Sequence, residues 1–422
     1  MQVFKFGGAS VKNAAAVRNV AQIIKGFSGE KLVVIVSAMG KTTNALEEVV
    51  NAHYQKNTQQ ALDLLAAIKN NHISIVQELM TDANNAVYEQ LNQTFRVVED
   101  RLQQGATSNY GFEYDQIVSL GELLATQIVA AYLNTVDIAS QWLDVRHLVH
   151  TDNTYREGQI QWKTTEKDIP TAIHAVWESG KIALTQGFLG GTPEGFTTTL
   201  GREGSDYTAA VFANILESQG MTVWKDVPGI LNADPRLVEN TVKIPVLSYY
   251  EAIEMTYYGA HVIHPKTIKP LQNKGIPLYV RSFVKPDEVG TVVQTELPAN
   301  TQLPPVVVIK SNQLLVSVFS NDFSFMAEEN LSDIYELFAA HRIKTNLTQN
   351  AAISFSACID NTPMRIEALL EALEEDYTVY KNEGLTLITI RHYTPEALEQ
   401  HTEGREILLS QKSRHTIQMV VR

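Results

Sequence analysis

The chain has 422 residues, of which 44% are hydrophobic and 19% are charged, and this length favours two or three compact units over a single domain. Its net charge of −13 weighs against a nucleic-acid or anionic-membrane partner, because either surface would repel the protein at long range. The single cysteine, Cys358, excludes an internal disulfide and any multi-cysteine metal site.

The N-terminus shows no targeting segment. Residues 1–10, MQVFKFGGAS, indicate a strand followed by a glycine turn, without a charged region that leads into a long apolar core. The strongest apolar runs, such as LVVIVSAM, are shorter than the roughly 20 residues that a membrane-spanning helix needs. We therefore expect a cytoplasmic protein without a membrane partner.

Strand and helix patterns alternate through about residue 290. Strands are expected over residues 3–6, 32–36, 181–186, 221–224 and 277–280, and helices over residues 17–24, 115–133 and 249–258. This alternation predicts an α/β fold with a mainly parallel central sheet covered by helices, in a domain over residues 1–290. Residues of about 45–105 interrupt it with a long, polar helical pattern, which predicts a helical insertion that could form part of a lid.

A different organisation is expected after a linker at residues 291–305, which is rich in Pro and Thr. Strands are predicted over residues 314–319, 353–359, 385–390 and 416–421, and helices over residues 331–341, 365–373 and 395–409. Residues 306–422 thus indicate an α+β regulatory region of two βαβ units, of which the second stops at its last strand and is truncated.

The first glycine-centred segment, KFGGAS at residues 5–10, lies at the exit of the first strand. Adjacent glycines let backbone N–H groups turn toward an anion, and the ammonium of Lys5 could balance transferring phosphoryl oxygens. An ordinary strand-ending turn has the same residues, so this segment alone leaves both interpretations open.

The second segment, GREGSDYTAA at residues 201–210, opens an apolar helix, so Ser205 or Asp206 is expected at or near its N-cap. Asp206 could simply cap the helix, with Arg202 as a solvated charge. Alternatively, Arg202 pairs bidentately with a substrate carboxylate, and Asp206 holds Mg²⁺ or orients a phosphate-bound lysine.

The third segment, WKDVPGI at residues 224–230, suits either the edge of a nucleotide pocket or a surface turn.

Two other patterns do not match the motifs that they resemble at first. A P-loop that ends at Gly40-Lys41-Thr42 would need glycine where Ile35 stands, and His261 and His264 lack the spacing of a helical zinc site.

Together these segments resemble the aspartokinase branch of the amino-acid kinase family. Seven motifs occur in the family's order over residues 1–290: KFGG at 5–8, SA at 37–38, GE at 121–122, QGF at 186–188, GR with GSD at 201–206, DVPGI at 226–230 and GA with HP at 259–265. The last 120 or so residues are similar to the paired ACT domains of aspartokinases. The resemblance implies a three-layer amino-acid kinase sandwich that uses ATP and Mg²⁺.

The implied activity is phosphorylation of the side-chain carboxylate of L-aspartate, the first step of lysine, threonine and methionine biosynthesis. By resemblance, Lys5 and Asp206 are catalytic: Lys5 stabilises the transferring phosphoryl group and Asp206 organises Lys5 and the metal-bound phosphates. Arg202 is implied to bind the α-carboxylate of aspartate and Glu122 its ammonium. The acceptor site is completed by Ser37, Thr43, Gly204 and Ser205.

The residues implied at the nucleotide are Lys5, Gly7, Gly8, Ser10, Lys225, Asp226, Leu231, Arg236 and His261. Several positions depart from the family's pattern. Glu203 replaces a glycine after Arg202, Lys225 replaces a Thr or Ser, Leu231 stands where an aromatic residue often meets the nucleotide, and His261 replaces a lysine. An acidic Glu203 near phosphates is costly unless it points away or helps to hold Mg²⁺.

The regulatory region departs further, because Asn346 stands where the family commonly has an Asp and would remove an acidic partner of an effector ammonium. A homodimer through this region and an amino-acid effector, lysine or threonine, are expectations, and no fused homoserine dehydrogenase is expected. Two other functions stay open: a kinase for glutamate or an acylated amino acid, and a catalytically silent amino-acid sensor. Glu122 separates the first, because only a free ammonium needs an anionic partner.

Overall fold

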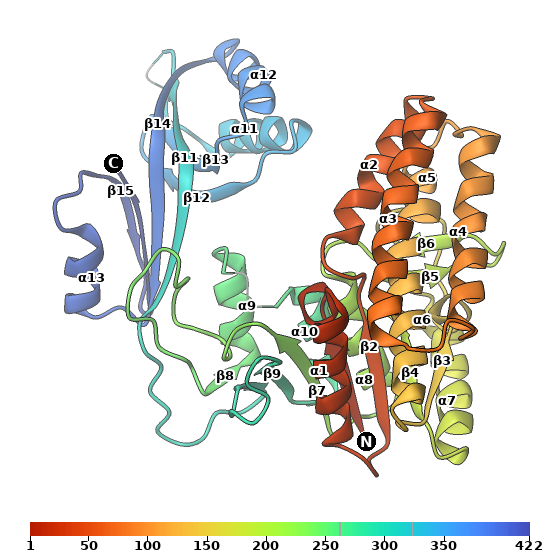
Figure 1. The fold of residues 1–422 in the computed structure, drawn as a ribbon. Helices are drawn as coiled ribbons and strands as arrows, with labels where there is room; N and C mark the ends of the chain where they lie inside the picture. The colour runs from red at the N-terminus through yellow and green to blue at the C-terminus, as the bar shows by residue number, and fades with distance from the viewer. Residues whose placement is uncertain (261–262, 323) are drawn as a thin grey trace. The chain divides into compact units, whose positions relative to one another are not determined.

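The structure is a computed structural model that describes residues 1–260, 263–322 and 324–422. The chain divides into two compact units, which are not continuous in sequence (Figure 1). The first consists of Met1–Ile230, Pro245–Ile253 and Ile263–Pro298, and the second of Leu231–Ile244, Glu254–Val262 and Ala299–Arg422. The predicted assignment of residues 1–290 to catalysis and 306–422 to regulation stays a prediction.

An eight-stranded sheet forms the centre of the first unit. Its strands, in order across the sheet, are β3 (Ser140–Leu143), β4 (Ile182–Gln186), β2 (Leu32–Val36), β1 (Gln2–Phe6), β7 (Gly220–Lys225), β9 (Leu278–Ser282), β10 (Thr291–Gln294) and β8 (Val246–Ser248). The strands from β3 to β9 are parallel, whereas β10 runs antiparallel to β9 and β8 runs parallel to β10.

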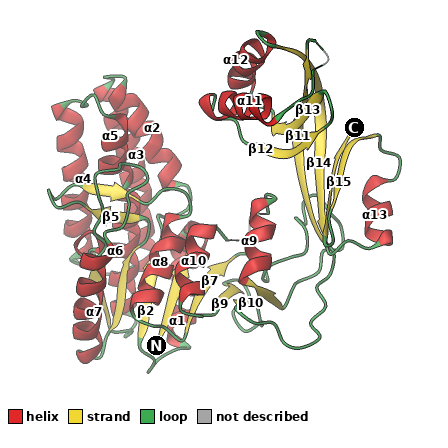
Figure 2. Cartoon of the chain, turned by 180° about the vertical axis from the view of Figure 1, so that it is seen from behind, coloured by secondary structure: helices red, strands yellow, loops and turns green. Residues whose placement is uncertain are grey.

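Helices cover both faces of this sheet. They are α1 (Ala14–Lys25), α2 (Thr42–Tyr54), α3 (Thr58–Leu79), α4 (Val87–Gln104), α5 (Tyr110–Val118), α6 (Leu120–Thr135), α7 (Trp162–Glu178), α8 (Gly204–Ile215) and α10 (Pro265–Asn273), with short 3₁₀ turns at Gly8–Val11 and Val145–His147. Helices α1 and α6 pack on one face with α3 and α4 outside them, and α7 and α8 pack on the other with α10 beside α8 (Figure 2).

Two further elements lie outside these layers. A small hairpin consists of β5 (Leu189–Gly191) and β6 (Thr197–Thr199). Helix α9 (Tyr249–Tyr257) has residues in both units.

Side-chain alternation along β1 explains the direction of its one charged side chain, Lys5. Successive side chains of a strand point to opposite faces of the sheet. Phe4 and Phe6 are fully buried in the core that also contains α1 and α6, so Lys5 between them points to the other face, toward α8.

One helical stretch of the described residues, Tyr110–Thr135, is long and apolar enough to cross a membrane. However, 83% of the residues in its apolar window are buried inside the protein. A core helix of a globular protein has the same length and composition, so this stretch is weak evidence for a membrane span.

The second unit contains a six-stranded antiparallel sheet. Its strands, in order, are β12 (Thr345–Asn350), β13 (Ser354–Asp360), β11 (Val306–Ser320), β14 (Tyr377–Arg391), β16 (Thr416–Val421) and β15 (Ile407–Lys412), and its helices are α11 (Glu328–Ala340), α12 (Pro363–Glu374) and α13 (Pro395–Thr402). Helices α11 and α12 share a hydrophobic core with β11 and β13. The predicted fold class, a mainly parallel α/β sandwich plus an α+β region of ACT type, is confirmed.

Two predicted helices differ from the structure. The helix predicted over residues 395–409 is wrong in its second half, because α13 ends at Thr402 and Ile407–Lys412 form β15. Gly404 separates the two elements with a φ of +72°, a left-handed conformation that ends a helix. The strand β15 pairs with β16. The second predicted βαβ unit, which was expected to be truncated, therefore has one more strand than predicted. The helix predicted over residues 115–133 is divided at Ser119 into α5 and α6.

Candidate active site

The carboxyl ends of the parallel strands β1, β2 and β4 meet at one edge of the sheet, which is where ligands bind in open α/β sheets. Lys5 lies near the end of β1, Ser37 directly follows β2, and Phe188 follows β4. The first turn of α8, which comes later in the sequence, adds Ser205 and Asp206. These residues border one cavity of about 670 Å³.

A buried ion pair joins β1 to α8. The Nζ atom of Lys5 lies 2.7 Å from Oδ1 of Asp206, and the two side chains are only 12% and 5% exposed. Burial alone would raise the pKa of Asp206, but the positive charges of Lys5 and Lys225 outweigh burial and hold this pKa below its usual value. Asp206 is therefore ionised at neutral pH and keeps the Lys5 ammonium at the edge of the cavity.

Glu122 lies in the first turn of α6 and reaches the cavity beneath the loop that follows β2. The backbone N–H of Ala38 donates a hydrogen bond to its Oε1 atom, 3.2 Å away, while its Oε2 atom has no partner among the described residues. This approach requires the neighbouring Gly121, because a side chain there would meet the Cβ atom of Ala38 at 2.8 Å. Burial raises the pKa of Glu122 to about 8, although the Ala38 N–H and the charge of Lys5 lower it.

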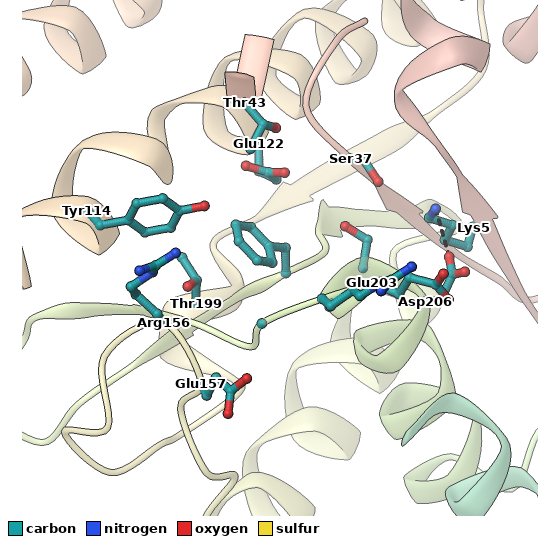
Figure 3. Close-up of a pocket in the computed structure, with 15 residues that line it drawn as sticks. Lys5, Ser37, Thr43, Tyr114, Glu122, Arg156, Glu157, Thr199, Glu203 and Asp206 are labelled. Atoms are coloured by element: carbon teal, nitrogen blue, oxygen red, sulfur yellow. Dashed lines mark ion pairs between the residues drawn. The ribbon is translucent and has the colours of Figure 1, made fainter. Parts of the chain in front are cut away.

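All the residues that the sequence assigned to catalysis and to the acceptor border this one cavity. They are Lys5, Ser37, Thr43, Glu122, Arg202, Gly204, Ser205 and Asp206. Figure 3 shows Lys5 and Asp206 at one end of the cavity, with Glu122 and Thr43 above it. The structure places these side chains together, and their individual roles stay predictions.

Several residues of the cavity wall were not predicted: Tyr114, Arg156, Glu157, Phe188 and Thr199. Phe188 belongs to the QGF motif, which identified the segment without assigning this residue a role. Residues 151–158 carry no motif, and they reach the cavity through contacts that are distant in sequence. The Gly158 N–H donates to the Thr199 carbonyl oxygen at 2.8 Å, and the Arg156 N–H donates to Oδ2 of Asp115 at 2.9 Å.

Glu203 precedes α8 in a left-handed conformation, with a φ of +54°. Its Oε2 atom accepts a hydrogen bond from the backbone N–H of His264, at 2.9 Å. The glutamate was expected to be costly near phosphates unless it pointed away or helped to hold Mg²⁺. Its carboxylate is engaged by this backbone donor, which provides a local reason for its presence.

The residues predicted at the nucleotide lie in different places. Gly8 packs close to the loop after β2, because an added side chain would meet the carbonyl oxygen of Ala38 at 2.7 Å. The Ser10 hydroxyl is buried and donates to the Gly7 carbonyl oxygen at 2.6 Å. Helix α1 begins only at Ala14, so the glycine turn leads first into a 3₁₀ turn.

Among those nucleotide residues that the structure describes, only Lys5 borders the cavity. Lys225 ends β7, and Asp226 follows it. Leu231 and Arg236 belong to the second unit, where Arg236 pairs with Asp234. His261 lies outside the described residues. Among residues 1–260, 263–322 and 324–422, no group of three or more His, Cys, Asp or Glu side chains could by itself hold a metal ion.

Comparison with known proteins gives a consistent picture. The model of the amino acid kinase family matches residues 1–282. Aspartokinase 1 of Arabidopsis thaliana, a chloroplastic protein, is 29% identical over 92% of this chain and 68% of its own length. Lysine-sensitive aspartokinase 3 of Escherichia coli is 29% identical over 92% of this chain and 86% of its own length.

Two solved structures of Escherichia coli aspartokinase III are similar over the whole chain. One, in complex with lysine and aspartate, has a TM-score of 0.84 at 27% identity, and the other, in complex with aspartate and ADP, has a TM-score of 0.81 at the same identity. Each covers 100% of this chain and 96% of the solved one. The similarity therefore extends over both units.

Proposed function

Because this chain belongs to the amino acid kinase family, we propose that it transfers the γ-phosphoryl group of ATP to the side-chain carboxylate of L-aspartate, forming 4-phospho-L-aspartate. The observation that carries the proposal is the cavity in which the Lys5–Asp206 ion pair and the buried carboxyl of Glu122 lie together. The full-length similarity to an aspartokinase that has been crystallised with aspartate and ADP supports the choice of both substrates.

The acceptor needs little activation, because a carboxylate is already a nucleophile at neutral pH. Catalysis then rests on positioning and on neutralising the negative charge of the phosphoryl group. Lys5 is the cation that would neutralise this charge, and Asp206 holds its ammonium in place. Glu122 receives the ammonium of the amino acid, and Arg202 its α-carboxylate. Thr43, Ser37 and the start of α8 enclose the rest of the acceptor.

Mg²⁺ fits the donor set, although the described residues provide no group of three or more His, Cys, Asp or Glu side chains that could hold it alone. This ion is usually held by one or two carboxylates together with substrate phosphates. Asp206 would supply the carboxylate, and the bound ion would neutralise charge on the phosphate oxygens. On the nucleotide side we propose Gly7, Gly8, Ser10, Lys225 and Asp226 at the phosphates, with Leu231, Arg236 and His261 toward the rest of ATP.

We also infer that residues 306–422 form an ACT-type regulatory region through which two copies pair, and which takes an amino-acid effector. The antiparallel sheet with α11 and α12 supports the fold assignment. The similar Escherichia coli enzyme has been crystallised with lysine. Light scattering tests the dimer, and rates measured with lysine or threonine added separately identify the effector. A cytoplasmic location stays a prediction, and the plant relative is named as chloroplastic.

ADP release with different acceptors tests the proposed function. Purified protein with ATP and Mg²⁺ is expected to release ADP with L-aspartate and much more slowly with L-glutamate or N-acetylated amino acids. The acetylated compounds lack the ammonium that Glu122 would bind. Faster release with an acetylated acceptor, from folded protein, would overturn the assignment of the substrate.

A further inference from the structure

Arg156 is a charged residue of the cavity wall to which the sequence motifs assign no role. It lies with Tyr114 across the cavity from Lys5 and Asp206 (Figure 3). The group to be phosphorylated must approach Lys5, so Arg156 borders the end of the cavity that receives the rest of the acceptor.

The backbone of Arg156 is held in place by a buried carboxylate. Its φ of +70° is left-handed, which is uncommon for a residue with a side chain. The Arg156 N–H donates to Oδ2 of Asp115 at 2.9 Å, and Asp115 also accepts from the Thr199 N–H at 3.0 Å and the Thr199 hydroxyl at 2.7 Å. Asp115 is completely buried. One carboxylate thus fixes both Arg156 and Thr199, which border the cavity.

Two tyrosine rings of α5 hold the guanidinium group. Its Cζ atom lies 4.6 Å from the ring centre of Tyr114 and 5.7 Å from that of Tyr110. The rings are themselves anchored, because the Tyr114 hydroxyl donates to Glu47 and the Tyr110 hydroxyl to Asn51, each at 2.9 Å. Stacking engages the face of a guanidinium group and leaves the N–H donors at its edge for other partners.

Those donors have no protein acceptor in the described part of the chain: no ion pair or side-chain hydrogen bond of Arg156 occurs within residues 1–260, 263–322 and 324–422. The buried carboxylate that accepts from the Arg156 N–H, Asp115, is occupied by the three donors described above. Arg156 is an exposed residue of the cavity wall, so these donors are accessible from solvent. A guanidinium group packed against two rings, with accessible donors, is suited to a carboxylate ligand.

On the basis of the proposed function, we propose that Arg156 binds the α-carboxylate of the acceptor and selects for amino acids in which this group is charged. The β-carboxylate of aspartate must face Lys5, so the α-carboxylate is the anion available to the opposite end of the cavity. A carboxylate has about four lone-pair sites on two oxygens, and can accept from Arg156 and Arg202 together. Arg156 is thus a specificity-determining residue, positioned by Asp115 and by the two tyrosines.

The test compares L-aspartate with its α-amide, L-isoasparagine, which keeps the β-carboxylate and the ammonium but has no α-carboxylate. Arg156→Gln is expected to lower kcat/KM for aspartate by about 10- to 100-fold, mainly through KM, because a charge-assisted hydrogen bond is lost. The same variant should change kcat/KM for the amide by less than about threefold. Arg156→Lys keeps the charge without the planar fork and should lie between the wild type and Arg156→Gln.

Arg96→Gln is the matched control, because Arg96 is an exposed residue of α4 that does not border the cavity. It removes the same charge and should leave both substrates unaffected. If the wild type does not phosphorylate the amide, the inhibition constant of the amide against aspartate provides the comparison.

Three outcomes are decisive. A wild-type enzyme without aspartate-dependent activity would overturn the proposed function itself. An active wild type in which Arg156→Gln weakens aspartate and the amide equally would show a structural role and overturn the inference alone. Unchanged kinetics of Arg156→Gln with both substrates would also overturn it.

Discussion

At the scale of single residues, Glu122 is the buried acid whose ionisation should be visible in substrate binding. Its pKa of about 8 in the unliganded cavity follows from burial, so most molecules carry a protonated Glu122 at pH 7. An ammonium placed against it would stabilise the carboxylate and lower this pKa. Binding of the amino acid should therefore release a proton.

The affinity for aspartate is accordingly expected to rise with pH up to about 8 and then to level off. Below that pH, part of the binding energy is spent on removing the proton from Glu122. KM for aspartate measured between pH 6 and 9 checks this expectation. Glu122→Gln should raise KM and abolish the pH dependence below 8, and a KM that is constant with pH in the wild type would contradict the assignment.

The Lys5–Asp206 pair should matter for turnover far more than for folding. Lys5→Ala or Asp206→Ala is expected to lower kcat at least about a hundredfold, because a preorganised charge at the transferring group is lost. The exposed pair of Lys274 and Glu217, 2.9 Å apart, offers a control. Lys274→Ala should retain full turnover, because exposed ion pairs contribute little. A Lys5 or Asp206 variant with near-normal kcat would refute its role.

The acceptor side of the site could be predicted because its residues stand in short motifs that resemble those of aspartokinases, and the resemblance implied their roles. Lys5 lies near the end of β1 and Ser37 directly follows the neighbouring parallel strand β2, so their closeness agrees with the sheet. Arg156 and Tyr114 could not be predicted in this way. Their place depends on Asp115 bonding to a loop more than forty residues away, for which the sequence has no signal.

At the scale of elements, α3 carries a buried histidine that should make the helical insertion sensitive to acid. His72 is fully buried, its Nδ1 atom lies 2.8 Å from the Ile68 carbonyl oxygen, and its Nε2 atom has no partner among the described residues. Burial lowers the pKa of His72 below its ordinary value of 6.5, even though the Ile68 carbonyl raises it. The unfolded chain therefore binds this proton more readily than the folded one.

The resulting stability is fully present above the unfolded-state pKa of about 6.5 and is lost as the pH falls below it. His72→Leu should flatten the decrease in free energy of unfolding between pH 7 and 5, measured by urea denaturation. His174→Leu, at an exposed histidine of α7, is the control and should not change the slope. An equally steep decrease in His72→Leu would contradict the explanation.

Elements were predictable where one pattern dominated. Residues 32–36 are an uninterrupted run of apolar residues and form β2 over Leu32–Val36. Residues 395–409 mix two patterns, since a helix leads through Gly404 into a short apolar run that could belong to a helix or a strand. The pairing of that run with β16 decides for a strand, and pairing is not visible in local sequence.

At the scale of the whole molecule, the two units have separate hydrophobic cores and carry different natural probes. All four tryptophans, Trp142, Trp162, Trp177 and Trp224, belong to the first unit. The one cysteine, Cys358, is completely buried in the second unit, and burial raises the pKa of its thiol to about 12.

Denaturation followed by these probes should therefore give two transitions. Because proteins with several domains commonly depart from a single two-state transition, we expect different urea midpoints from tryptophan fluorescence and from thiol labelling of Cys358. The native thiol should react slowly, since it is buried and protonated. Coincident midpoints would show one cooperative unit and contradict this expectation.

The existence of two units could be expected from length and from the change in pattern near residue 300. Their discontinuity could not, because Leu231–Ile244 and Glu254–Val262 join the second unit through contacts of distant segments. Asn232, for example, bonds to Val307 and to Pro305.

The central claim is that a β-carboxylate becomes an acyl phosphate. Acyl phosphates react with hydroxylamine, so the protein with ATP, Mg²⁺, L-aspartate and hydroxylamine should form aspartyl hydroxamate, with the hydroxamate at the side-chain (β) carboxyl group as identified by NMR. No hydroxamate from folded protein, or a hydroxamate at the α-carboxyl group, would contradict the claim.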